Sequence, residues 1–65
     1  MRLDEAIKRA GSQETIRRKS WKNDGISIKP TDSERCCEMY LFDKLLSDRW
    51  NPYREDLLAT DWILN

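Results

Sequence analysis

The chain has 65 residues, which corresponds to one small domain over residues 1–65. A chain of this size buries only about 60% of the surface that it exposes when unfolded, so its hydrophobic core is small. Twelve basic and twelve acidic residues cancel, which argues against a strongly basic nucleic-acid-binding protein. The sequence has no apolar run long enough to span a membrane and no signal peptide, so we predict a cytoplasmic protein with no membrane partner.

The charge is distributed unevenly along the chain. Residues 1–31 carry eight basic and four acidic groups, a net charge of +4, and residues 32–65 carry four basic and eight acidic groups, a net charge of −4. Such a polarised domain pairs with a second copy or offers a basic face to an anion. The alternative is that solvated charge simply falls unevenly along the chain.

The cysteine content argues against covalent or metal-based stabilisation. Cys36 and Cys37 are adjacent and bridge only through a strained eight-membered ring, so we do not expect either to cross-link the fold. Two cysteines without any histidine do not make a zinc site, and we expect no metal and no cofactor. Small domains that lack disulfides and bound metals usually depend on a partner chain, so the sequence predicts a homo-oligomer.

The first predicted elements are a helix and a strand. Apolar residues recur at intervals of three and four over Leu3–Ala10, which predicts a helix that ends at Gly11. Thr15–Lys22 has no helical period and is predicted to be a strand. Alternation in a strand places Ile16 and Trp21 on opposite faces. Either a bulge brings Trp21 into the core, or Trp21 lies away from the core as a ligand or subunit contact.

A tight turn and a returning strand are predicted next. Asn23-Asp24-Gly25 favours a hairpin turn, because the Asp-Gly pair accepts positive φ angles. The returning strand covers Ile26–Lys29 and is expected to end at Pro30, which has no N–H to donate to a ladder.

The middle of the chain has two interpretations. In one, Thr31 and Glu34 form a capping box at the start of a helix. In the other, residues 31–35 are a loop that leads into a strand over Cys36–Phe42. We favour the strand, because two strands alone make a poor sheet.

The C-terminal third is predicted to contain a turn-rich segment over residues 47–53, one or two helical turns over Arg54–Thr60, and a short edge strand over Asp61–Leu64. We expect Trp62 to anchor the core, because an indole buries on the order of 200 Å². Leu57 and Leu58 are predicted to pack with it. The predicted fold class is therefore α+β, with an N-terminal helix on a small antiparallel sheet and a short C-terminal helical turn.

Two motifs in this chain resemble those of a family of small phage proteins. The N-terminal motif consists of Leu3-Asp4-Glu5-Ala6-Ile7-Lys8 and Ile16-Arg17-Arg18-Lys19-Ser20-Trp21. The C-terminal motif consists of Trp50-Asn51-Pro52 and Asp56-Leu57-Leu58-Ala59-Thr60-Asp61-Trp62. The family includes the second family of Thoeris anti-defence proteins, and many of its ligand-binding members carry a long middle insertion that this chain lacks.

The resemblance implies the same α+β domain, usually in a homo-oligomer, and a function as a sponge. Thoeris TIR-domain enzymes make cyclic ADP-ribose isomers on infection. A sponge binds that cyclic nucleotide signal in the cytoplasm of the host cell and keeps it from its effector. No bond is broken in this process.

The sequence contains the side chains that a nucleotide-like ligand needs. Such a ligand requires cationic donors for phosphate, an aromatic face for the base and acceptors for ribose hydroxyls. The candidate binding residues are Arg17, Arg18, Lys19, Trp21, Trp50, Asp56 and Asp61, with Tyr53 and Trp62 as further aromatic faces. The competing interpretation makes the basic run a solvated strand face, the tryptophans core residues, and the two aspartates helix caps or salt-bridge partners.

Catalysis fits the sequence less well. The chain has no histidine for acid–base chemistry near neutral pH, and its only glycines, Gly11 and Gly25, do not form a phosphate-binding loop. We therefore do not expect an enzyme. The alternative function is a small protein that binds and inhibits a host enzyme or defence factor. A nucleic-acid partner is disfavoured by the zero net charge.

Overall fold

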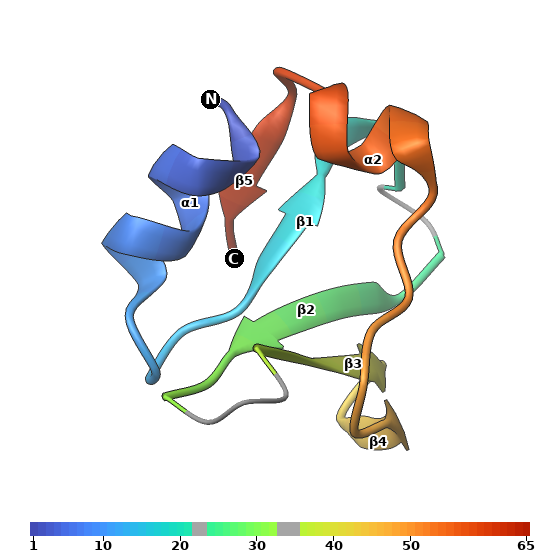
Figure 1. Ribbon diagram of the computed structural model, residues 1–65. Coiled ribbons are helices and arrows are strands. Elements are labelled where there is room, and N and C mark those ends of the chain that lie inside the picture. The colour runs from blue at the N-terminus through green and yellow to red at the C-terminus, as the bar shows by residue number, and fades with distance from the viewer. Residues whose placement is uncertain (22–23, 33–35) are drawn as a thin grey trace.

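A computed structural model describes residues 1–21, 24–32 and 36–65 of the chain. Its centre is a five-stranded antiparallel sheet in the order β4-β3-β2-β1-β5 (Figure 1). The strands are β1 (Ile16–Arg18), β2 (Ile26–Pro30), β3 (Cys37–Leu41), β4 (Lys44–Ser47) and β5 (Trp62–Leu64). Helix α1 (Leu3–Ala10), a 3-10 turn η1 (Lys19–Trp21) and helix α2 (Arg54–Leu58) complete the elements. The predicted α+β class is confirmed.

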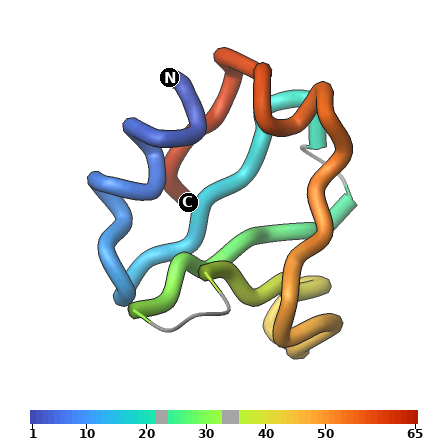
Figure 2. The backbone as a smooth tube through the Cα atoms, viewed as in Figure 1, coloured from blue at the N-terminus to red at the C-terminus, as the bar shows by residue number. Residues whose placement is uncertain are grey.

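The core lies between α1 and strands β1, β2 and β5. Ala6 and Ala10 are buried, and their small side chains let the helix approach the sheet closely. Ile16 and Ile28 face each other across β1 and β2, and both are fully buried. Figure 2 shows α1 on one side of the molecule and the long connection that carries α2 on the other. The buried core consists of Ala6, Ala10, Ile16, Ile28, Cys37 and Trp62.

Helix α1 has the predicted bounds and end. Asp4 and Glu5 occupy its first turn and Lys8 and Arg9 its last, so both pairs oppose the charge of the helix dipole. Gly11 has a φ of +59°, and its N–H donates to the carbonyl of Ile7 at 3.1 Å. Glycine takes this left-handed conformation without steric cost, which explains why the helix stops there.

The predicted strand over Thr15–Lys22 is wrong beyond Arg18, and Lys22 lies outside the described residues. Asp61 supplies the physical reason. Its carbonyl accepts the N–H of Lys19 at 3.0 Å, and its carboxylate accepts the N–H of Ser20 at 3.3 Å. These bonds draw the chain into η1, which turns Trp21 toward the core without a bulge.

The turn before β2 is not the tight hairpin that we predicted, because β1 ends at Arg18 and β2 begins at Ile26. Asn23 lies outside the described residues. Gly25 has the expected positive φ of +73°. A Cβ at Gly25 would lie 2.6 Å from the ring of Phe42, so glycine is also needed for this close approach. Strand β2 extends one residue further than predicted, through Pro30.

The middle of the chain contains β3, so the strand interpretation is confirmed over Cys37–Leu41 and the helix is wrong. Cys36 and Phe42, which flank the strand, have φ angles of +61° and +54° and lie outside it. Glu34 of the expected capping box is outside the described residues. Sequence reasoning missed β4, which pairs with β3 through an irregular register.

In the C-terminal third, the predicted edge strand is confirmed, and the predicted packing of two leucines is wrong. Trp62 in β5 is fully buried, but Leu57 and Leu58 are 53% and 67% exposed. Helix α2 is only five residues long and turns Asp56 inward. Positions one and two residues beyond an inward residue do not share its face of a helix, so the two leucines point to solvent.

The two edges of the sheet differ. The Met1 amino group donates to the carbonyl of Trp62 at 2.9 Å, and the Trp62 N–H donates to the carbonyl of Met1 at 3.0 Å. The N-terminal residue therefore covers the outer edge of β5 at Trp62. Strand β4 forms the opposite end of the sheet, and no described strand pairs with its outer edge.

We expect Trp62→Phe to destabilise the protein and Leu58→Ala to have little effect. The indole N–H of Trp62 donates to the buried carbonyl of Asp56 at 2.9 Å, and leaving that carbonyl unpaired costs about 1–3 kcal/mol. Removal of an exposed leucine changes the free energy of unfolding by about 0.5 kcal/mol or less. Urea denaturation of both variants measures the difference, and equal losses would contradict the assignment of Trp62 as the core anchor.

Candidate ligand-binding site

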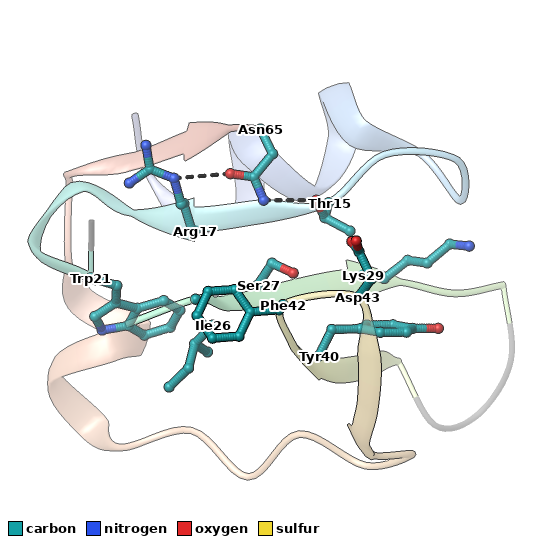
Figure 3. A pocket seen from close by; sticks show the side chains of 11 residues that line it. Thr15, Arg17, Trp21, Ile26, Ser27, Lys29, Tyr40, Phe42, Asp43 and Asn65 are labelled. Carbon is teal, nitrogen blue, oxygen red and sulfur yellow. Dashed lines mark hydrogen bonds between the residues drawn. The ribbon is translucent and has the colours of Figure 1, made fainter. Parts of the chain in front are cut away.

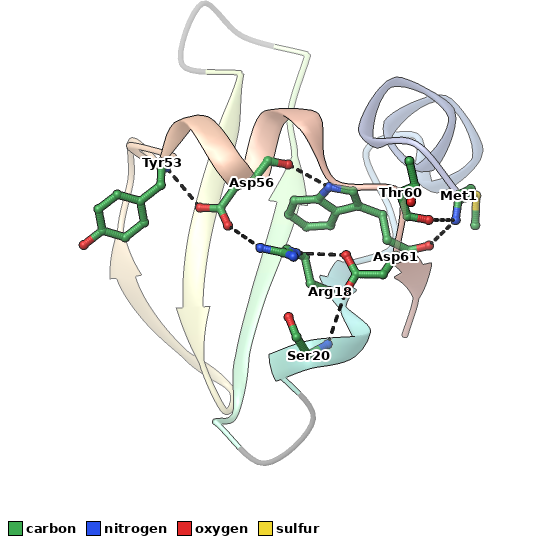
Figure 4. A network of polar contacts seen from close by, with 8 residues as sticks. Met1, Arg18, Ser20, Tyr53, Asp56, Thr60 and Asp61 are labelled. Atoms are coloured by element: carbon green, nitrogen blue, oxygen red, sulfur yellow. Dashed lines mark hydrogen bonds and ion pairs between the residues drawn. The ribbon is translucent and has the colours of Figure 1, made fainter.

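Three of the predicted site residues bind one another. Arg18 donates from Nε to Asp61 at 2.9 Å and from Nη1 to Asp56 at 3.0 Å (Figure 4). The second oxygen of Asp56 accepts the N–H of Tyr53 at 3.0 Å, which caps α2. The hydrogen bond with Asp61 raises the pKa of Arg18, and the same bond lowers the pKa of Asp61. Arg18, Asp56 and Asp61 thus join β1, α2 and the start of β5, and we call them the ion-pair network.

The three tryptophans form a chain of ring contacts beside this network. Trp21 and Trp50 each meet Trp62 edge to face, with ring centroids 5.2 Å and 5.6 Å away. This geometry is favourable for aromatic pairs. Because Trp62 is also fully buried, it is a core residue. Trp21 and Trp50 are half-buried, and each keeps part of its ring available at the surface.

A hollow of about 440 Å³ lies next to the ion-pair network. Its lining includes four of the predicted residues, Arg18, Trp21, Trp50 and Asp56. One arginine and two carboxylates, Asp56 and Glu55, give this lining a net charge of −1. The donors of Arg18 already bind carboxylates, so this hollow is a poor site for an anion.

A second hollow, of about 540 Å³, lies on the other side of the sheet (Figure 3). Side chains alternate between faces along a strand, so residues next to buried Ile16 and Ile28 point away from α1. This outer face carries Arg17, Ser27 and Lys29. We call this hollow the sheet-face pocket, and its lining residues are Thr15, Arg17, Trp21, Gly25, Ile26, Ser27, Lys29, Tyr40, Phe42, Asp43 and Asn65.

The polar side of the sheet-face pocket is built around Arg17. Its Nε donates to Asn65 at 2.9 Å, and the Asn65 amide donates to Thr15 at 2.7 Å (Figure 3). These bonds hold the guanidinium at the rim. Its Nη1 is buried, and no described residue accepts a hydrogen bond from it. Lys29 adds a second cation and Asp43 one carboxylate, so the net charge of the lining is +1.

The apolar side of this pocket is aromatic. Phe42 lies over Gly25, and its N–H donates to the Gly25 carbonyl at 2.6 Å. The Tyr40 hydroxyl donates to Glu38 at 3.1 Å, which fixes the ring along β3 and raises the Tyr40 pKa. Together with Trp21, these rings line the same pocket as Arg17 and Lys29 (Figure 3). The lining thus combines the donors, cations and stacking surfaces that an aromatic anion requires.

The structure divides the residues that the sequence suggested. Arg17 and Trp21 line the sheet-face pocket, whereas Arg18, Asp56 and Asp61 hold the fold together. Trp50 packs against the core, and Lys19 is exposed in η1.

Sequence reasoning missed the other nine residues that line the sheet-face pocket, among them Lys29, Tyr40, Phe42, Asp43 and Asn65. The alternation of Ile28 and Lys29 was a usable signal for Lys29. The others depend on pairings that the sequence does not reveal, such as Ser27 with Tyr40.

We expect the ion-pair network to make the protein sensitive to acid. The folded-state pKa of Asp61 is depressed, so its contribution is fully present above the unfolded value of about 3.9 and is lost as the pH falls toward the folded value. Asp61→Asn should lower stability by about 1 kcal/mol at neutral pH and reduce the loss of stability below about pH 4. Urea denaturation across this range tests both effects.

Asp4→Asn is the matched control, because Asp4 pairs with Arg2 on the surface, where both side chains are more than 70% exposed. Its stability profile should follow that of the wild type. An Asp61→Asn profile as steep as that of the wild type in acid would contradict the role of Asp61.

Comparison with known proteins gives one result that covers almost the whole chain. The family model described as Tad2-like, Thoeris anti-defense 2-like domain, matches residues 1–64. Searches among curated proteins and among solved structures found no match. Among the described residues, no helix is long and apolar enough to cross a membrane. The resemblance carried by the two sequence motifs is confirmed, and the chain belongs to the Tad2-like family of Thoeris anti-defense 2-like domains.

Proposed function

We propose that the protein is a non-catalytic sponge that sequesters a cyclic nucleotide signal of the cyclic ADP-ribose kind. The family assignment supports a phage anti-defence role. The observation that carries the proposal is the buried Nη1 of Arg17, a residue of the sheet-face pocket, because this donor has no acceptor among the described residues. An unsatisfied buried donor is costly, and a phosphate oxygen would satisfy it.

The proposed ligand matches the chemistry of the lining. Arg17 and Lys29 face its phosphates, Trp21 and Phe42 offer surfaces for the base, and Asp43 accepts from ribose hydroxyls. A volume of about 540 Å³ falls within the usual range for small-molecule sites. The pocket has no histidine, and its cations serve binding rather than proton transfer. The signal is therefore held and not converted.

A thermal-shift panel of cyclic ADP-ribose isomers and cyclic dinucleotides tests the proposal. A ligand at 100 times its Kd stabilises the folded state by about 2.7 kcal/mol, which raises the melting temperature of so small a domain by about 10 °C or more. Mass spectrometry of the molecule released on denaturation should recover it unchanged. Absence of a shift with every compound at saturation would refute the sponge, and a converted product would show an enzyme.

Substitutions in the sheet-face pocket should weaken binding of any compound that gives a shift. Arg17→Ala removes a charge-assisted hydrogen bond worth about 1.5–3 kcal/mol, so the Kd should rise about tenfold to a hundredfold. Lys8→Ala removes an equal charge from the exposed surface of α1 and should leave the Kd unchanged. Titration calorimetry measures both values, and an unchanged Kd for Arg17→Ala would place the ligand elsewhere.

We also propose that the protein forms a homo-oligomer through the outer edge of β4. Several large apolar side chains of the β3–β4 hairpin are exposed, namely Leu41, Phe42, Leu45 and Leu46. An open edge with apolar flanks pairs readily with another strand, and a second copy supplies an identical one. The other edge of the sheet is partly covered, because Met1 pairs with Trp62 of β5.

Leu46→Lys should convert the oligomer into a monomer, because a charge on an edge strand opposes edge-to-edge pairing. Leu58→Lys introduces the same charge at an exposed leucine of α2 and should leave the oligomer intact. Size-exclusion chromatography with light scattering gives the mass of each. A monomeric wild type at micromolar concentration would refute the oligomer, and dissociation by Leu58→Lys alone would move the interface to α2.

A further inference from the structure

The only two thiols of the chain lie side by side at the start of β3. Neighbours in a strand point to opposite faces, yet the sulfur atoms of Cys36 and Cys37 are 2.9 Å apart. Cys36 has a φ of +61°, which is uncommon for a residue with a side chain. This conformation places its sulfur on the same side as that of Cys37. The contact thus results from a special backbone geometry and not from strand alternation.

The two thiols differ in access to solvent. Cys36 is exposed, and Cys37 is only 2% exposed. Burial, together with the hydrogen bond to Cys36, raises the pKa of the Cys37 thiol to about 12. A reagent in solution therefore reaches the Cys36 sulfur first. The Cys37 sulfur is in place to react with whatever forms on Cys36.

We propose that Cys36 and Cys37 are a reversible modification site that reacts with a small-molecule disulfide, such as oxidised glutathione, and closes as a vicinal disulfide. In the first step the Cys36 thiol loses its proton to solvent and attacks one sulfur of the oxidant, forming a mixed disulfide and releasing one thiol. In the second step the Cys37 sulfur attacks the Cys36 sulfur, the bond between Cys36 and the oxidant's sulfur breaks, and the departing thiolate takes the Cys37 proton and leaves as the second thiol. Two electrons pass from the cysteine pair to the oxidant, which becomes two thiols.

The geometry supports closure within one chain. A disulfide bond has a length of about 2.05 Å, so the two sulfurs need to approach by less than about 1 Å. The chain holds no third cysteine to compete. The product is an eight-membered ring, which is strained, and strained disulfides are readily reduced by thiols. Reaction with a thiol therefore reverses the modification.

The carbonyl groups of both cysteines accept hydrogen bonds in the folded protein, so closure of the ring affects these bonds. The Cys36 carbonyl accepts from the N–H and the hydroxyl of Thr31 at 2.6 Å and 3.1 Å. The Cys37 carbonyl accepts the N–H of Trp50 at 2.9 Å, and the Trp50 ring meets Trp62. The ring contains the peptide that carries the Cys36 carbonyl and the Cα atom that carries the Cys37 carbonyl, so its closure shifts the acceptors of both Thr31 and Trp50. Tryptophan fluorescence should report the oxidation.

To test the proposal, the 65-residue protein is incubated with oxidised glutathione, and its intact mass is measured without reductant. We expect a single chain that has lost two hydrogens, a fall in free thiols from two to zero, and a change in tryptophan fluorescence that dithiothreitol reverses. A stable glutathione adduct on Cys36 with Cys37 still free would overturn the proposal. A covalent dimer of two chains would overturn it as well.

Two variants test which cysteine reacts in each step. Cys37→Ser should stop at the mixed disulfide, with one glutathione on Cys36. Cys36→Ser should acquire no glutathione, because the remaining thiol is buried. If either substitution prevents folding, the mass of the oxidised wild type still decides the question. None of these measurements uses a nucleotide, so their outcome is independent of the sponge function.

Discussion

The interaction on which the rest of the structure depends is the pairing of Arg18 with two carboxylates that come from different parts of the C-terminal third. Asp56 lies in α2, and Asp61 lies just before β5. The same Asp56 presents its carbonyl to the indole of Trp62, the largest buried side chain. One arginine thus fixes the position of the helix, the edge strand and the core anchor. Its removal would leave two carboxylates without a counter-ion, one of them only 5% exposed.

Adjacent residues in β1 have separate tasks because a strand alternates its side chains. Arg18 points to the side of the core and is neutralised there, while Arg17 points to the outer face and keeps a donor without an acceptor among the described residues. The sequence motif that contains both therefore contributes to the scaffold and to the proposed binding surface. The carboxylates belong to the scaffold, and the unpaired cation belongs to the pocket.

The sequence predicted the fold well where local signals decide it. Helix α1, its end at Gly11, the edge strand β5 and the burial of Trp62 follow from periodicity, glycine chemistry and side-chain size. The prediction was wrong where residues far apart in the chain determine the local structure. Asp61 ends β1 by capturing amides more than forty positions away in the chain, and no pattern around Lys19 reveals this. The exposure of Leu57 follows from the inward orientation of Asp56, which the sequence left open between a ligand contact and a helix cap.

The pocket was harder to predict than the fold for a similar reason. Its lining is contributed by strands β1, β2 and β3, by the β3–β4 turn and by the last residue, so it exists only once the register is set. The Phe42 ring lies against Gly25, and the sequence around Phe42 predicts neither this contact nor the positive φ of Phe42. Substitutions on the outer face can change the lining of the sheet-face pocket while the ion-pair network on the core side is left intact.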